Sequence, residues 1–227
     1  MKKLKLFYER YKHGIPLIIY GVIYLTWFSY LEQTVTRSYR LIHMTVDDHI
    51  PFCEYFIVPY LLWFLYVSVV VIFFFFKNKT EYYQTCTYLF TGMTIFLIIS
   101  TLWPNGHHLR PMILPRDNVF TNMVSMLWRT DTPTNLWPSI HVYNSLGAHF
   151  AIVKSKELGK NKVVCSLSRI LAFSIILSTM FLKQHSVFDV LTAFAMAAIM
   201  YSIVYEINIV DFLQTRNEKA KRKPQVE

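Results

Sequence analysis

The stretch Tyr55–Phe76 reads YFIVPYLLWFLYVSVVVIFFFF and carries no charged side chain over its 22 residues. An α-helix rises 1.5 Å per residue, so a run of this length reaches across the ~30 Å hydrocarbon core of a bilayer. In lipid the backbone N–H and C=O groups have no water to bind, so such a segment must form a helix. The stretch therefore predicts a transmembrane helix and an integral membrane protein.

Five further apolar stretches give the chain its predicted layout. The fourth stretch along the chain is the weakest, because His141, Asn144, Ser145 and His149 interrupt it. The fold is predicted to be all-α, a single integral membrane domain over residues 1–227 with six transmembrane helices in one bundle. The five further stretches are 15–31, 86–103, 138–153, 163–182 and 186–210.

The overall composition supports this class of protein. The chain is 54% hydrophobic, 17% aromatic and 16% charged, with a mean hydropathy of +0.32. A soluble domain would carry about a quarter charged residues, so a soluble globular enzyme and a disordered chain are both disfavoured. The net charge of +9 does not indicate nucleic acid, because the basic residues flank apolar stretches instead of forming one face. We expect no nucleic-acid partner.

Lysine and arginine are distributed unequally between the predicted connections. Sixteen of the 23 lie at the two ends of the chain and in the connections after the second and fourth helices, whereas six lie in the other connections. Basic residues are enriched on the cytoplasmic side of membrane proteins. Both termini are therefore predicted to be cytoplasmic, in a multi-pass protein of a cell membrane, with the long connection 104–137 outside. The short basic ends fit a bacterial membrane.

Ionisable side chains at membrane depth indicate the candidate site, because each costs roughly 2.5–3.5 kcal/mol there. His185 and Asp189 are four residues apart at the start of the last helix, which places them on one helix face. A carboxylate that accepts from one imidazole nitrogen leaves the other unprotonated, as a nucleophile or a metal ligand requires. His141 follows Pro138-Ser139 at a predicted helix start, and topology brings it to the same outer side.

Basic side chains on this side predict an anion site. The guanidinium fork of Arg110 matches phosphate or carboxylate oxygens, and Lys183, two residues before His185, offers a second positive charge. The adjacent His107 and His108 are expected to be solvated. No spacing typical of metal ligands occurs, so we expect no metal, no cofactor and free thiols at all three cysteines.

Three short motifs then follow one another along the chain. They are Arg110-Pro111, then Pro138-Ser139-Ile140-His141, then His185 with Asp189 four residues later. This order, spread over six predicted helices, resembles the type 2 phosphatidic acid phosphatase superfamily of lipid phosphate phosphatases and phosphotransferases. The motifs lie between Asn105 and Asp189, and the helix layout extends the resemblance to most of the chain.

The resemblance implies a role for each of five residues. His185 would attack the phosphorus atom and form a phosphohistidine, Asp189 would orient it, and His141 would protonate the departing oxygen. Arg110 and Ser139 would bind the phosphoryl oxygens. Such a reaction needs no metal.

The sequence departs from the family pattern at two phosphate-binding cations. Trp103 stands where the family has Lys, and Thr179 where it has Arg. Helical spacing places Lys183 on the face of Thr179, so Lys183 is the candidate replacement there and a further substrate-binding residue. Arg116 or Arg129 is the candidate for the other position. A third motif without its Arg also resembles the sphingomyelin synthase and inositol phosphorylceramide synthase branch.

We therefore expect a membrane enzyme that hydrolyses a lipid phosphomonoester or pyrophosphate at the outer face. A lipid headgroup phosphotransferase would use the same residues, with a lipid hydroxyl in place of water. A non-catalytic lipid-phosphate binder or transporter would keep the fold without turnover. In each case the partners are the bilayer and a phosphate-bearing membrane lipid.

Overall fold

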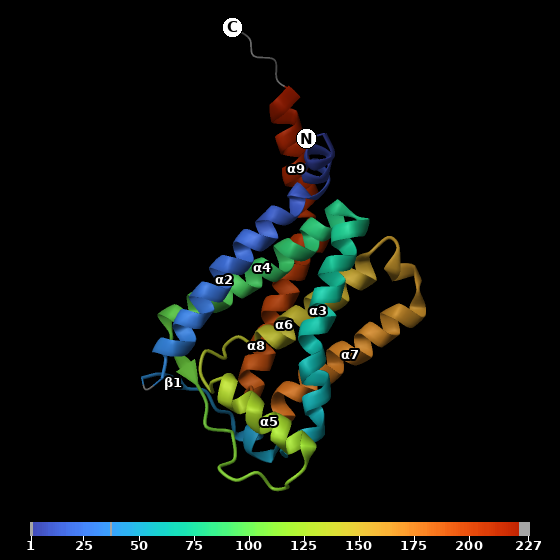
Figure 1. Ribbon diagram of the computed structural model, residues 1–227. Helices are drawn as coiled ribbons and strands as arrows, with labels where there is room; N and C mark the ends of the chain where they lie inside the picture. The colour runs from blue at the N-terminus through green and yellow to red at the C-terminus, as the bar shows by residue number, and fades with distance from the viewer. Residues whose placement is uncertain (1, 37, 223–227) are drawn as a thin grey trace.

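The computed structural model describes residues 2–36 and 38–222, and this part of the chain is mostly helical, as predicted. Helices α1 and α9 lie at one end of the bundle and α5 lies at the other, which we call the α5 end (Figure 1). The α-helices are α1 (Lys2–Tyr11), α2 (Ile15–Thr34), α3 (Ile57–Lys77), α4 (Lys79–Leu102), α5 (Val119–Thr130), α6 (Ile140–Lys154), α7 (Lys162–Phe181), α8 (Val187–Tyr201) and α9 (Ile209–Arg222).

Five helical segments are long and apolar enough to cross a membrane. The last of them combines α8 with the π-helix Ser202–Glu206, which continues it without a break. The chain is thus an all-α protein with the helices of a membrane protein. The five segments are Lys5–Thr34, Glu54–Lys77, Lys79–Leu102, Lys162–Phe181 and Val187–Glu206.

The remaining predicted helix, α6, occupies the centre of the bundle. It has 15 residues and so measures about 22 Å, less than the ~30 Å core of a bilayer. It packs against α3, α4, α7 and α8, which shield it on several sides. Asn144 and Ser145 are buried among these helices, so α6 can carry polar side chains that a lipid-facing helix would not tolerate.

Close packing of α4 against α6 depends on two glycines and two tyrosines. A Cβ atom on Gly92 would overlap the Tyr143 ring, and a Cβ atom on Gly147 would overlap the Tyr88 ring. The two rings stack with centroids 4.7 Å apart, and the Tyr143 hydroxyl donates to the Tyr88 carbonyl (2.7 Å). Small residues thus let the helix backbones approach, as is usual in membrane bundles.

Two helix boundaries differ by four residues or more from the predicted ones. α4 begins at Lys79 and not at 86, because Asn78 caps it: its side-chain oxygen accepts from the amides of Thr80 and Glu81 (3.0 and 3.2 Å). An apolar stretch cannot reveal these first polar turns. At the other end, Asn208 has a left-handed backbone (φ 54°) and lies between the last membrane-length segment and α9, so the predicted 186–210 helix was too long.

The connection 104–137 is partly ordered by a helix that the search for apolar stretches does not predict. Asn118 caps α5 by accepting from the Thr121 amide (3.0 Å). A short parallel pairing of β1 (Arg40–Leu41) with β2 (Asn105–Gly106) then joins the first connection of the α5 end to this one. Both connections therefore lie over the helix ends where His141 and His185 are found.

Candidate active site

The turn between α7 and α8 holds His185 in place. The backbone amides of Gln184 and His185 both donate to the carbonyl of Thr179 (2.9 and 3.0 Å). Lys183 adopts a left-handed conformation (φ 54°) that reverses the chain. His185, 5% exposed, is thus set at the α5 end by the way α7 terminates.

Asp189 links this turn to the first turn of α8. Its Oδ2 accepts from the Ser186 amide (2.9 Å), while the Ser186 hydroxyl accepts from the Phe188 amide (3.2 Å). The two residues form a capping box, which satisfies free donors at the helix start. The same Oδ2 lies 3.5 Å from Nδ1 of His185, so one carboxylate both caps the helix and faces the imidazole.

His141 reaches the site from the first turn of α6. Ser139 is the N-cap of that helix, with its hydroxyl accepting from the Val142 amide (3.4 Å), and its own amide donates to the Asp189 carbonyl (3.3 Å). The start of α6 is thereby tied to α8. Nδ1 of His141 lies 3.3 Å from Nε2 of His185, so the structure brings the two predicted histidines together.

The Asp189 carboxylate, 3.5 Å from Nδ1 of His185, favours the tautomer of His185 that carries its proton on Nδ1. In that tautomer Nε2 of His185 is unprotonated. Nδ1 of His141 then donates to that nitrogen. Burial and, to a smaller extent, the nearby Arg110 charge together lower the pKa of His185 to about 3. His185 is therefore neutral at physiological pH, with a free lone pair facing a proton donor.

Two aromatic rings of α3 cover His141. The Tyr60 and Trp63 ring centroids lie 4.7 and 4.3 Å from that of the imidazole. The Tyr60 hydroxyl also donates to the carboxylate of Asp131 (3.1 Å). These contacts hold the imidazole ring against α3, and sequence analysis predicted none of the three partners.

Arg110 is fixed by a network at the end of α5. One terminal nitrogen donates to the carbonyls of Trp128 and Asp131 (3.2 and 2.8 Å), and the other donates to Oε1 of Gln184 (2.5 Å). Gln184 in turn donates to the Asp131 carboxylate (3.2 Å). Since Gln184 precedes His185, the guanidinium is attached directly to the turn that carries the predicted nucleophile.

Asp131 balances the charge of this guanidinium. Burial raises the pKa of its carboxyl to about 6, against the lowering effect of Arg110. Burial also lowers the pKa of Arg110, although a guanidinium remains charged at any physiological pH. The Asp131 carboxylate, which neutralises Arg110, is therefore protonated more readily than an ordinary aspartate. An incoming anion thus meets a guanidinium whose neutralising partner readily loses its charge.

His107 is buried and not solvated, contrary to the prediction. Its Nδ1 accepts from the Leu109 amide (3.2 Å), so its Nε2 carries the proton and donates to the Gln184 carbonyl (2.9 Å). Burial lowers its pKa to about 4. His108 is exposed, as expected. The sequence could not distinguish the two histidines, because they are adjacent in one loop. Their exposure depends on which side of the turn packs against the protein.

Several buried polar atoms around the histidines have no hydrogen-bond partner among the described residues. They include Nε of Arg110, Nε1 of Trp63, Nδ1 of His185 and Oδ1 of Asp189. An unsatisfied buried group costs roughly 1–3 kcal/mol, so a concentration of them is typical of a functional site. Three of the four are N–H donors; that of His185 faces Asp189, and those of Arg110 and Trp63 are the donors that binding of an anion requires.

The candidate replacement cations are engaged elsewhere. The Lys183 ammonium donates to the carbonyls of Asp47 and Ile50 (2.9 and 2.5 Å), so it reaches a phosphate only by giving up these bonds. Nε of Arg116 lies 3.1 Å from the buried Glu54 carboxylate. The structure does not bring either side chain into the network of Arg110, and Arg129 is exposed.

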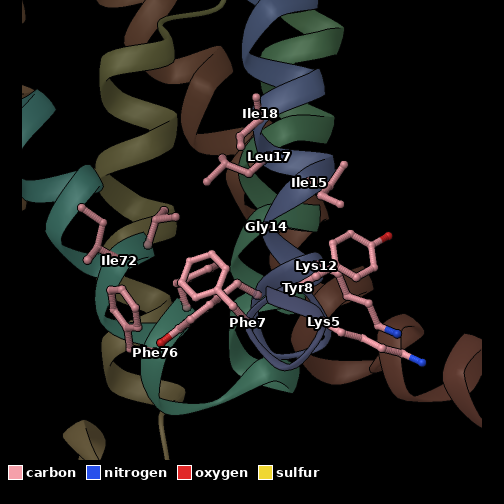
Figure 2. Close-up of a pocket in the computed structure, with 13 residues that line it drawn as sticks. Lys5, Phe7, Tyr8, Lys12, Gly14, Ile15, Leu17, Ile18, Ile72 and Phe76 are labelled. Atoms are coloured by element: carbon pink, nitrogen blue, oxygen red, sulfur yellow. The ribbon is translucent and has the colours of Figure 1, made fainter. Parts of the chain in front are cut away.

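An apolar groove lies at the opposite end of the bundle. It has a volume of about 970 Å³ and is lined by α1, α2 and the end of α3, including Ile18, Ile72 and Phe76 (Figure 2). None of the ionisable site residues lines it. Within the described residues no group of three or more His, Cys, Asp or Glu side chains is arranged to hold a metal ion.

Comparison with known proteins gives no relative. No protein-family model, no curated protein and no solved structure matches the chain.

Proposed function

We propose that the chain is a metal-independent lipid phosphate phosphatase that works through a phosphohistidine at the outer membrane face. The observation that carries the proposal is the 3.3 Å contact between Nε2 of His185 and Nδ1 of His141, with Asp189 behind the first ring. A neutral, oriented imidazole facing a proton donor is what nucleophilic attack on phosphorus and departure of an alcohol need.

The reaction proceeds in two steps. Nε2 of His185 attacks the phosphorus atom, the bond to the lipid oxygen breaks, and His141, acting as imidazolium, protonates that oxygen and becomes neutral. Water then attacks the phosphohistidine, the P–N bond to His185 breaks, His141 accepts the proton of the water, and phosphate leaves. The Nε–H of Arg110 and the Nε1–H of Trp63 supply unpaired donors for the phosphoryl oxygens, and such donors stabilise charge spread over those oxygens.

The proposed membrane topology follows from the arrangement of the helices. The position of α1 and α9 at the same end of the bundle (Figure 1) supports an even number of crossings, and we propose that the short α6 crosses together with the five longer segments. The excess of basic residues assigns the α1 and α9 end to the cytoplasm. The α5 end, with both histidines, then faces outward, and a lipid substrate keeps its chain in the bilayer.

Attack on phosphorus requires the two imidazoles to separate. The phosphorus atom must approach Nε2 of His185 to about 3–3.5 Å. Nδ1 of His141 already lies 3.3 Å from that nitrogen, so the His141 ring fills the place of the phosphorus atom. Substrate binding therefore moves the His141 ring away from His185, against its contacts with Tyr60 and Trp63.

The test is a paired assay on protein purified in lipid–detergent micelles. Wild type, His185→Ala and the matched control His108→Ala, which alters an exposed imidazole, receive a panel of lipid phosphates and phospholipids. Free phosphate and new lipids are both measured. We expect phosphate release from wild type and the control, and none from His185→Ala.

Two other results would contradict the proposal. A new headgroup-bearing lipid without free phosphate would identify a phosphotransferase. Binding of lipid phosphates without any turnover, equal in wild type and His185→Ala, would identify a binder.

A further inference from the structure

A buried carboxylate outside the predicted site forms hydrogen bonds with the turn that holds His185. Asp47, 2% exposed, belongs to the 3-10 helix Thr45–His49 of the connection between α2 and α3. Its Oδ2 accepts from the Ser186 hydroxyl (2.6 Å) and its Oδ1 from the Val187 amide (2.8 Å). Its backbone carbonyl accepts from the Lys183 ammonium (2.9 Å).

These bonds enclose His185 on both sides in the sequence. Lys183 is two residues before the imidazole and Ser186 is the residue after it, and both are bonded to Asp47. Ser186 is also shared between two carboxylates, because its hydroxyl donates to Asp47 and its amide donates to Asp189 (2.9 Å). The backbone around His185 is therefore held by one carboxylate in the first turn of α8 and by another that is 138 positions away along the chain.

The burial of Asp47 indicates more than a surface contact. A buried carboxylate is expensive unless it is fully hydrogen-bonded, and this one accepts a third bond from the Met44 amide (2.8 Å). Its negative charge also lies at the start of α8, where the helix dipole favours an anion. Asp48, the next residue, offers a contrast: it is exposed, and its salt bridge is to the exposed His43.

We propose that Asp47 is a positioning residue for His185: it fixes Ser186 and Lys183, and so holds the imidazole with Nε2 toward His141 and Nδ1 toward Asp189. The inference rests on the proposed function for its effect on rate. Its effect on the orientation of the imidazole is independent of that function. Without the Asp47 carboxylate, the Ser186 hydroxyl loses its acceptor, the capping box loosens, and the ring samples other orientations.

The test uses ¹⁵N-histidine-labelled full-length protein in lipid–detergent micelles. The ring signals of His185 are assigned by their loss in His185→Asn, and they report which nitrogen carries the proton. Asp47→Asn is compared with the matched control Asp48→Asn. We expect the control to keep the wild-type signals and turnover. In Asp47→Asn we expect mixed tautomers and a kcat about 10- to 100-fold lower with KM nearly unchanged, as for loss of a hydrogen bond to a charged group.

Unchanged His185 signals together with a kcat within about twofold of wild type would overturn the proposal. If Asp47→Asn does not fold, Ser186→Ala removes the same hydroxyl bond and is judged by the same two readouts. If wild type turns over no lipid phosphate, the proposed function fails, and the ¹⁵N signals alone decide whether Asp47 positions the ring.

Discussion

Nε2 of His185 lies 3.3 Å from Nδ1 of His141, although 44 positions separate the two residues in the chain. The contact joins the turn after α7 to the first turn of α6, and Asp189 touches both elements through its side chain and its carbonyl. The two imidazoles are therefore unequal: one has a carboxylate behind it and the other has aromatic rings. In the proposed mechanism this asymmetry makes His185 the nucleophile and His141 the acid.

Loss of the acid should depend on the leaving group. In His141→Ala, hydrolysis of a lipid phosphomonoester is expected to slow by about 10²–10⁴-fold, the usual contribution of a general acid. Hydrolysis of a nitrophenyl phosphate should slow much less in the same variant, since nitrophenolate departs without a proton. The measurement is kcat/KM for both substrates in both proteins. Equal losses on the two substrates would argue against this role for His141.

Replacing Arg110 by lysine keeps the charge but removes the fork. A single ammonium cannot bond the Trp128 and Asp131 carbonyls and Gln184 while leaving a donor for phosphate. Arg110→Lys is expected to lower kcat/KM by about 10- to 100-fold, as for a lost charge-assisted hydrogen bond. The exposed Arg40→Lys is the matched control and should match wild type. Wild-type kinetics in Arg110→Lys would show that the fork is not used.

Neutral His107 makes the stability depend on pH. Its pKa falls from an ordinary 6.5 to about 4 in the folded protein, so between these values the unfolded chain binds a proton that the folded chain does not. The contribution of neutral His107 to the free energy of unfolding is complete above pH 6.5. About 3 kcal/mol of this free energy is lost as the pH falls toward 4. His107→Gln keeps a donor for the Gln184 carbonyl and cannot titrate.

The melting temperature of His107→Gln should accordingly fall less than that of wild type between pH 7.5 and pH 4.5. Both proteins are measured in the same detergent, with His108→Gln as the exposed control. The same slope in wild type and His107→Gln would mean that His107 is not the buried neutral group described.

Most of the helical layout could be predicted from the sequence, because lipid-facing helices must be apolar over their whole length. The exceptions have one physical origin. α6 and the start of α4 are polar, since protein or a capping side chain, and not lipid, surrounds them. α5 covers one end of the bundle and needs only one apolar face, so hydropathy does not reveal it.

The candidate site was predictable only where a short motif or the order of the helices brings residues together. Four-residue spacing placed Asp189 beside His185, and topology brought His141 to the same end. Asp47, Asp131 and Gln184 carry no local signal, because their partners come from distant connections. Lys183 was predicted to bind phosphate from its spacing to Thr179, but its ammonium bonds backbone carbonyls, since the left-handed turn at that position redirects the side chain.

Packing between α4 and α6 gives a stability prediction away from the site. Gly92→Val places methyl groups into the Tyr143 ring and is expected to destabilise the protein by about 1–3 kcal/mol, as overpacking usually does. Gly21→Val is the control, because a Cβ at Gly21 meets no atom within 4 Å. Thermal melting in detergent separates the two. Equal melting temperatures would contradict the close approach of these helices.

The central claim is that His185 becomes phosphorylated during turnover. The direct measurement is rapid quenching of wild type with a lipid phosphate, followed by mass spectrometry under alkaline conditions, which preserve phosphohistidine. We predict a single phosphoryl group on His185 in wild type, a greater amount in a variant whose second step is slowed, and none in His185→Ala. Turnover with no phosphorylated residue, or with the phosphoryl group on another side chain, would contradict the account.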